Sequence, residues 1–272
     1  MPEVSTTSST FAGDADAYEL LMGRWSRRLA LPFIDFAGTD DGETVLDVGC
    51  GTGSLALALL EKANLAAVTG IDLSQAYIER ANGLTDDPRV TFETGDACAL
   101  PYADGAFDRT LSLLVLNFVP DAAGAVAEMV RVTRPGGVIA AAVWDLRGGF
   151  PLFRMFWDTA SVVDPEALSL RARYFSGPLT RPGELAEMWS SLGLEAVEQS
   201  FVTIRMDFDS FQDYWRPLLG KTGPVGTYLE GLTDERRAEL EQRTRAAYES
   251  GDPDGPRSFA ATAWVCRGTA PA

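Results

Sequence analysis

Between Thr44 and Trp144 the chain alternates short apolar runs with segments of helical character. TVLDVG, AAVTGIDL and RVTFETGD are three of the apolar runs, and SLALALLEKA and QAYIERANG lie between them. Strands joined by helices of this length need right-handed crossovers, which produce a mostly parallel sheet covered on both faces. The alternation therefore predicts a doubly wound α/β core.

The segments on either side of this core have different patterns. Before it, apolar residues at helical spacing predict an N-terminal helical arm, and they comprise Leu20, Leu21, Trp25, Leu29 and Phe33. After Trp144 the alternation gives way to helices and loops with several prolines, and strand character returns at 194–208 and 257–268. We expect an arm at 1–40, a cofactor-binding core at 41–145, a helical lid or substrate cap at 146–192, and final strands at 193–272 with a helical insertion at 211–250.

The size and composition of the chain indicate an ordinary globular core. It has 272 residues, of which 46% are apolar, and a chain of this length buries about three quarters of its unfolded surface without a disulfide or metal. There are three cysteines, widely spaced and without a C-x-x-C pair, and no histidine. This usage favours reduced thiols over a disulfide framework and predicts no metal site.

The net charge limits the classes of partner. The chain has 23 Lys and Arg against 39 Asp and Glu, a formal charge of −16, which would repel a phosphate backbone. The first 19 residues lack a basic segment followed by an apolar one, and no run approaches the roughly 20 apolar residues that span a bilayer. We therefore expect a cytoplasmic protein that binds neither nucleic acid nor membrane.

The decapeptide VLDVGCGTGS, residues 45–54, is the most informative motif. An apolar strand ends there in three alternate glycines, Gly49, Gly51 and Gly53, and a helix follows directly. Glycine at such a turn removes Cβ atoms where the chain bends tightly and where a ligand touches the backbone. A dinucleotide fingerprint starting at Gly49 would need Gly or Ala at position 54, and Ser54 there argues against a nicotinamide oxidoreductase.

Three aspartates accompany the strand ends. Asp47 lies inside a strand that should be buried, so it either caps turn amides or orients the loop and the ammonium group of a ligand; we favour the second role. Asp72 ends the next strand, where an acid can accept both hydroxyls of a ribose. Asp96 ends a third strand and can accept a hydrogen bond from an adenine amino group while the amide of Ala97 faces the ring. Together they outline an adenosine with a substituent at its 5′ end.

These segments resemble the class I S-adenosylmethionine-dependent methyltransferases, in particular the small-molecule branch that includes ubiquinone/menaquinone methyltransferase-like enzymes. VLDVGCGTGS, GIDLS at 70–74, GDACALPYADGAFD at 95–108 and EMVRVTRPGG at 128–137 follow the order and spacing of the family. The resemblance implies a seven-stranded sheet whose last strand is antiparallel. It also implies S-adenosylmethionine as cofactor, with S-adenosylhomocysteine as product.

The resemblance also assigns residues to the cofactor. It places the methionine moiety at the glycine loop, the ribose at Asp72 and the adenine at Asp96 and Ala97. The arm, with Tyr18 and Arg24, resembles a lid over the cofactor carboxylate, although Arg24 as a surface residue is an equal alternative. The full set that we predict is Tyr18, Arg24, Asp47, Gly49, Cys50, Gly51, Gly53, Asp72, Leu73, Asp96, Ala97 and Leu113.

The residues for catalysis are less clearly marked. Asn117 occupies a position beside the transferred methyl group where many relatives have histidine, which weakens the case for base catalysis there. Asp145 follows the strand that ends at Trp144 and is a candidate proton acceptor, with a loop-capping role as the alternative. Methyl transfer from a sulfonium chiefly requires alignment and exclusion of water, so a base is not essential.

Aromatic residues predict an acceptor site. Trp144, Phe153, Trp157 and Tyr174 belong to segments that should lie over the carboxyl ends of the strands, where ligands bind in open α/β sheets. They would line a pocket for an apolar or aromatic acceptor, or alternatively form the core of the lid.

We expect a monomeric or homodimeric methyltransferase that acts on an O, N or C atom of a small molecule. The alternative is a catalytically inactive S-adenosylmethionine-binding regulatory or partner subunit.

Overall fold

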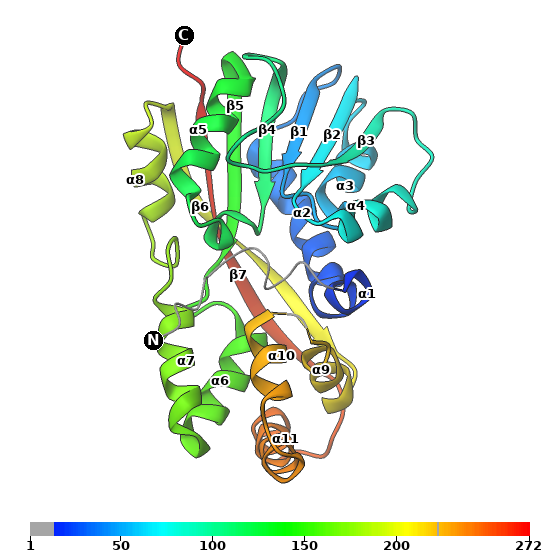
Figure 1. Ribbon diagram of the computed structural model, residues 1–272, viewed down its shortest axis with the longest axis vertical. Coiled ribbons are helices and arrows are strands. Elements are labelled where there is room, and N and C mark those ends of the chain that lie inside the picture. The colour runs from blue at the N-terminus through cyan, green and yellow to red at the C-terminus, as the bar shows by residue number, and fades with distance from the viewer. Residues whose placement is uncertain (1–13, 222) are drawn as a thin grey trace.

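The computed structural model describes residues 14–221 and 223–272. Residues 1–13 lie outside the described residues. They include the start of the predicted arm and most of the first 19 residues, in which the sequence has no basic segment followed by an apolar one. A seven-stranded sheet in the order β3-β2-β1-β4-β5-β7-β6 forms the centre of the molecule (Figure 1). Its strands are β1 (Thr44–Val48), β2 (Ala67–Asp72), β3 (Val90–Thr94), β4 (Phe107–Leu113), β5 (Thr133–Trp144), β6 (Glu195–Phe208) and β7 (Arg257–Thr269).

The helices connect and cover these strands. The N-terminal arm comprises α1 (Ala15–Tyr18), the π-helical turn η2 (Glu19–Gly23) and α2 (Arg24–Ala37). Within the sheet region lie α3 (Ser54–Lys62), α4 (Gln75–Asn82), the 3-10 turn η3 (Leu116–Phe118) and α5 (Ala122–Val132). The later helices are α6 (Pro151–Val163), α7 (Pro165–Phe175), α8 (Glu184–Ser191), α9 (Phe211–Leu218), α10 (Gly223–Glu230) and α11 (Asp234–Glu249).

The sheet topology confirms the predicted fold. Strands β1 to β5 are mutually parallel, whereas β7 runs antiparallel to both β5 and β6. Parallel pairing brings the carboxyl ends of β1, β2, β3 and β4 to one edge, because each strand returns through a crossover. The glycine loop and the acids that follow the strands therefore meet at that edge.

The core has a layer on each face of the sheet. Val45 of β1 packs in the cluster with α2 and α3, and the next residue, Leu46, packs in the opposite cluster with α5 and α8, as the period of two in a strand requires. In the arm, the helically spaced Leu21, Trp25, Leu29 and Phe33 are buried. Leu20 is exposed, although its neighbour Leu21 in the same π-helical turn is buried.

A second group of helices packs around the far ends of the long β6 and β7 strands, as Figure 1 shows. We call α6, α7, α9, α10 and α11 the helical lobe. Phe156 of α6 lies 6.2 Å from Trp215 of α9, and Trp157 lies 5.4 Å from Tyr228 of α10, measured between ring centroids. The predicted lid and the predicted insertion therefore pack on one another. Helix α8 lies apart from them, against β6 and β7.

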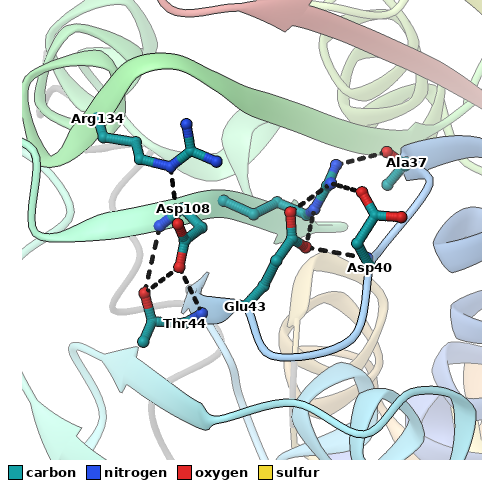
Figure 2. Close-up of polar contacts among 7 residues, drawn as sticks. Ala37, Asp40, Glu43, Thr44, Asp108 and Arg134 are labelled. Carbon is teal, nitrogen blue, oxygen red and sulfur yellow. Dashed lines mark hydrogen bonds and ion pairs between the residues drawn. The ribbon is translucent and has the colours of Figure 1, made fainter.

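Polar contacts fix the opposite edge of the sheet, away from the glycine loop. The carboxylate of Asp108 accepts hydrogen bonds from the amide of Thr44 at 2.8 Å and from Arg134 Nε at 2.7 Å (Figure 2). These bonds lower the pKa of Asp108 to about 2. The buried Arg109 guanidinium makes two 2.8 Å bonds to Glu43. The contacts join the start of β1 to β4 and so hold the strands whose other ends form the site.

None of the helices described has both the length and the apolar character needed to cross a membrane. Across 14–221 and 223–272 there is also no group of three or more His, Cys, Asp or Glu side chains arranged to hold a metal ion.

Candidate active site

A cavity of about 380 Å³ lies between the carboxyl ends of the strands and the helical lobe. Its walls come from the arm, from the loops after β1, β2, β3 and β4, and from α6 and α7. The structure brings together here ten of the residues predicted from the sequence. They are Tyr18, Gly49, Gly51, Asp72, Leu73, Asp96, Ala97, Trp144, Phe153 and Tyr174.

The glycine loop follows β1 in a conformation that suits glycine. Gly49, Gly51 and Gly53 have φ values of +71°, +54° and +88°, a region that other residues rarely adopt. The amides of Gly49 and Cys50 both donate to the carbonyl of Ile71, at 2.8 and 3.0 Å, which fixes the loop to β2. A Cβ atom on Gly49 would lie only 2.4 Å from Val115 Cγ2. The loop can therefore approach the segment after β4 only because position 49 has no side chain.

Asp72 at the end of β2 is tied to the same loop. Its Oδ2 accepts the amide of Gly51 and its Oδ1 accepts the amide of Ser74, both at 2.9 Å. Burial raises the pKa of Asp72, and the two amide donors act in the opposite direction. A carboxylate has about four acceptor positions, so each oxygen keeps one for a ligand hydroxyl. Leu73, the next residue, is exposed and lines the cavity.

Asp47 is fully buried beneath the glycine loop. Its Oδ2 accepts the amide of Ala56 in α3 at 3.1 Å, whereas its Oδ1 has no hydrogen-bond partner in the described part of the chain. The buried hydroxyls of Ser26 and Ser54 also have no hydrogen-bond partner in the described part of the chain. Asp47, Ser26 and Ser54 all line a second, very small cavity. Cys50, Leu113 and Thr52 also line it. Burial raises the pKa of Asp47 to about 8, with a smaller contribution from the charge of Asp72.

The surroundings of Asp47 combine the two roles considered from the sequence. One oxygen caps an amide, and the other is a buried acceptor without a donor. A buried polar atom without a partner is costly, and an ammonium group placed there would supply both the donor and the opposite charge. The residues present therefore fit the ammonium end of S-adenosylmethionine.

The arm covers the glycine loop. The Tyr18 ring packs on Tyr77 with 4.8 Å between centroids, and a Cβ atom on Gly51 would lie 3.6 Å from Tyr18 Oη. Glu19 accepts hydrogen bonds from the Thr52 hydroxyl and, at 2.6 Å, from Arg27 Nη1. These contacts hold the arm over the loop, which accords with the predicted lid.

Arg24 lies away from this lid contact. Its guanidinium Nη1 lies 3.0 Å from both carboxylate oxygens of Asp213 in α9, and it stacks 4.2 Å from the Trp25 ring. It is not among the residues that line either cavity in the described structure. The structure therefore favours a role for Arg24 in joining the arm to the helical lobe.

The loop after β3 forms the end of the cavity near Asp96. Asp96 Oδ1 accepts the amide of Cys98 at 2.9 Å, and Ala97 and Cys98 line the wall. Asp121, the N-cap of α5, lines the wall beside them, and its carbonyl lies 3.5 Å from Cys98 Sγ. Cys98 and Asp121 were not among the predicted site residues, and the position of Cys98 two residues after Asp96 was the available signal.

Four contacting rings form the opposite end, which we call the aromatic wall: Trp144, Phe150, Phe153 and Tyr174. Their centroids are 4.7, 4.9 and 5.6 Å apart in that order. All four line the cavity. Phe150 was not among the predicted acceptor residues. Trp157 was, but it is fully buried behind the wall, 6.5 Å from Tyr174, and is not among the lining residues described.

The two predicted catalytic residues lie outside the lining of the cavity as described. Asp145 Oδ1 accepts the amides of Arg147 and Gly148 at 3.2 and 3.1 Å, which is the loop-capping alternative. Asn117 lies in η3, and its Oδ1 is buried without a hydrogen-bond partner among the residues described. Its neighbours Val115 and Phe118 line the cavity instead.

Comparison with known proteins finds similarity to methyltransferases. The methyltransferase domain family matches residues 46–141. An uncharacterized protein of Mycobacterium tuberculosis (strain H37Rv) is 30% identical over 214 residues, covering 75% of this chain and 76% of that protein. The 27-O-demethylrifamycin SV methyltransferase of Amycolatopsis mediterranei is 42% identical over 103 residues, covering 36% of this chain and 38% of the relative.

A solved structure extends the similarity of fold beyond the core. It is a Haemonchus contortus phosphoethanolamine N-methyltransferase 2 in complex with phosphomonomethylethanolamine and S-adenosylhomocysteine. The TM-score is 0.58 at 20% identity, over 95% of this chain and 57% of that one. Matches to three curated methyltransferases cover only 38%, 37% and 40% of their lengths. Those matches therefore concern a part of each relative.

Proposed function

The chain belongs to the class I S-adenosylmethionine-dependent methyltransferases, and we propose that it transfers a methyl group from S-adenosylmethionine to an O, N or C atom of an apolar small molecule. The observation that supports this most strongly is that one cavity is lined both by the glycine loop, Asp72 and Asp96 and by the aromatic wall. Such a cavity can hold a nucleoside and an apolar acceptor side by side.

Each predicted cofactor residue has a chemical task in this proposal. When bound, S-adenosylmethionine supplies a methyl group that its sulfonium has already activated. Asp72 accepts the ribose hydroxyls with the lone pairs that Gly51 and Ser74 leave free. Asp96 accepts from the adenine amino group, and Asp47 Oδ1 accepts from the ammonium group.

The chain's contribution to the reaction is positioning. Displacement at a sulfonium methyl group requires a nucleophile aligned behind the carbon and a site free of competing water. The arm, held to the glycine loop through Glu19 and Thr52, closes one side of the cavity. The aromatic wall closes the other and aligns a planar acceptor. Acid–base groups are not needed for this task when the acceptor atom can attack without first losing a proton.

Replacing Asp72 with alanine is expected to weaken S-adenosylhomocysteine binding at least tenfold, or about 1.4 kcal/mol. The change removes both the ribose contacts and the hydrogen bond that holds Gly51. Titration calorimetry measures the effect. Asp86→Ala, at an exposed aspartate before β3, is the matched control and should bind as the parent does. An unchanged affinity in Asp72→Ala would remove this residue from the proposed site.

Methyl transfer itself is tested with labelled S-adenosylmethionine and a panel of phenols, amines and quinones. If the protein is an active methyltransferase, we expect it to transfer the labelled methyl group to at least one of these acceptors. A protein that binds S-adenosylhomocysteine but labels none of them would instead support the cofactor-binding regulatory subunit.

A further inference from the structure

We infer that the acceptor atom is an uncharged, weakly basic nitrogen in a planar aromatic molecule, such as a nitrogen heteroarene or an arylamine. This inference rests on the proposed function and adds the chemical class of the acceptor. Three features of the cavity lead to it: the aromatic wall, the charge of the remaining lining, and the protonation of Tyr174.

The aromatic wall selects for shape and for positive charge. Trp144 and Phe150 are stacked, with 26° between their planes, and Phe153 and Tyr174 continue the row through edge-on contacts. Trp144, Phe150 and Phe153 are almost completely buried. A wall of this kind packs against a flat apolar molecule, and the faces of its rings attract a cation.

The rest of the cavity is acidic. Asp72, Asp96 and Asp121 line it, whereas no Lys or Arg is among the lining residues of the part of the chain described. The whole chain has a formal charge of −16. These charges repel a carboxylate, phosphate or phenolate acceptor, and they stabilise positive charge within the cavity. An uncharged acceptor that becomes a cation fits both conditions.

Tyr174 is the titratable residue of the aromatic wall. Burial raises the pKa of its phenol, and its Oη has no hydrogen-bond partner in the described chain. Tyr174 therefore keeps its proton near neutral pH and acts as a donor, not as a base. A hydroxyl acceptor would have to lose its proton without help from the wall, whereas an uncharged nitrogen with a free electron pair can attack before any proton is lost.

The transfer to nitrogen is balanced without any proton movement. The nitrogen lone pair forms the new N–CH₃ bond while the C–S bond breaks and its electron pair stays on sulfur. The positive charge thereby passes from the sulfonium to the nitrogen, so the wall stabilises it before and after the step. A weakly basic nitrogen meets this requirement best, because a strongly basic amine would enter the acidic cavity already protonated and without a lone pair.

Three bicyclic acceptors of the same size test the acceptor class. Isoquinoline has the heteroaromatic nitrogen, 2-naphthol a hydroxyl and 2-naphthoate a carboxylate. We expect labelled methyl transfer to isoquinoline at least ten times faster than to 2-naphthol, and none to 2-naphthoate. A rate on 2-naphthol or 2-naphthoate that equals or exceeds the rate on isoquinoline overturns the inference. Transfer to none of the three also overturns it.

A binding measurement tests the same inference without turnover. N-methylisoquinolinium and 2-methylnaphthalene have nearly the same shape and differ in charge. We expect the S-adenosylhomocysteine complex to bind the cation at least about threefold more tightly than the hydrocarbon. Phe153→Leu and Tyr174→Leu should each reduce this ratio, and Phe201→Leu, an exposed ring on β6, should leave it unchanged. A ratio of one in the parent protein overturns the inference.

These outcomes separate the inference from the proposed function. If S-adenosylhomocysteine binds and a phenol or hydroquinone is methylated at least as fast as isoquinoline, the methyltransferase proposal stands and the nitrogen acceptor is wrong. If S-adenosylhomocysteine does not bind at all, the proposed function fails first.

Discussion

Replacing Gly49 with alanine is expected to weaken S-adenosylhomocysteine binding about a hundredfold and to lower the free energy of unfolding by about 2 to 4 kcal/mol. The new Cβ atom would lie 2.4, 2.6 and 2.8 Å from the Cγ2, Cγ1 and Cβ atoms of Val115. The φ of +71° adds a backbone cost for any residue with a side chain. Either the glycine loop or the segment after β4 must then move, and both line the cavity.

Gly42→Ala is the matched control for this prediction. Gly42 has a similar φ of +81°, yet a Cβ atom there would meet nothing within 4 Å. We expect it to lose about 1 kcal/mol of stability through the backbone alone and to bind S-adenosylhomocysteine normally. Chemical denaturation and titration calorimetry on both variants separate the steric cost from the backbone cost. Parent-like binding by Gly49→Ala would contradict a ligand site at the glycine loop.

The core could be predicted because its signals are local. Four of the five parallel strands, all except β4, end at or directly before a glycine or an aspartate. Both the order of the strands and the antiparallel β7 agree with the family that the motifs resemble. The apolar run that predicts β5 starts at Val138, but the strand begins at Thr133. Pro135 and Gly136 indicate a turn from sequence. In the structure Thr133 pairs with Phe107 of β4, and Gly136 and Gly137 exchange backbone hydrogen bonds with Ala270 after β7, so long-range pairing draws this segment into the strand.

Site residues could be predicted where several of them belong to one sequence motif. They were harder to predict where packing between distant segments decides whether a side chain reaches the cavity. Phe153 and Trp157 are four residues apart on α6, and both were assigned to the acceptor pocket because their segment should lie over the carboxyl ends of the strands. The structure separates them, because Tyr228 of α10 lies 5.4 Å from Trp157 and encloses it within the helical lobe. The position of Arg24 could not be predicted from sequence either, because its partner Asp213 is 189 residues away along the chain.

The electrostatics of Asp47 lead to a second large effect, which depends on pH. A carboxyl group whose pKa is about 8 in the folded protein and about 3.9 when unfolded binds more protons in the folded state. The stability of the ligand-free protein should therefore fall as the pH rises from about 4 to about 8. An ammonium group bound at Oδ1 reverses the preference, because it stabilises the carboxylate. Binding must then release the proton of Asp47 at any pH below about 8.

The affinity for S-adenosylhomocysteine is accordingly expected to fall about thirtyfold when the pH is lowered from about 7.5 to about 6, at tenfold per unit. The ligand's α-amino group is mostly protonated over this range, and the chain has no histidine whose titration would complicate it. Calorimetry in buffers of different ionisation enthalpy should show about one proton released on binding. Asp47→Asn keeps the shape of the side chain and cannot titrate, so its weaker binding should be independent of pH. The proposed contact between Asp47 and the ammonium group is wrong if the parent protein binds equally well at both pH values, since a ligand that meets a neutral carboxyl has no reason to expel its proton.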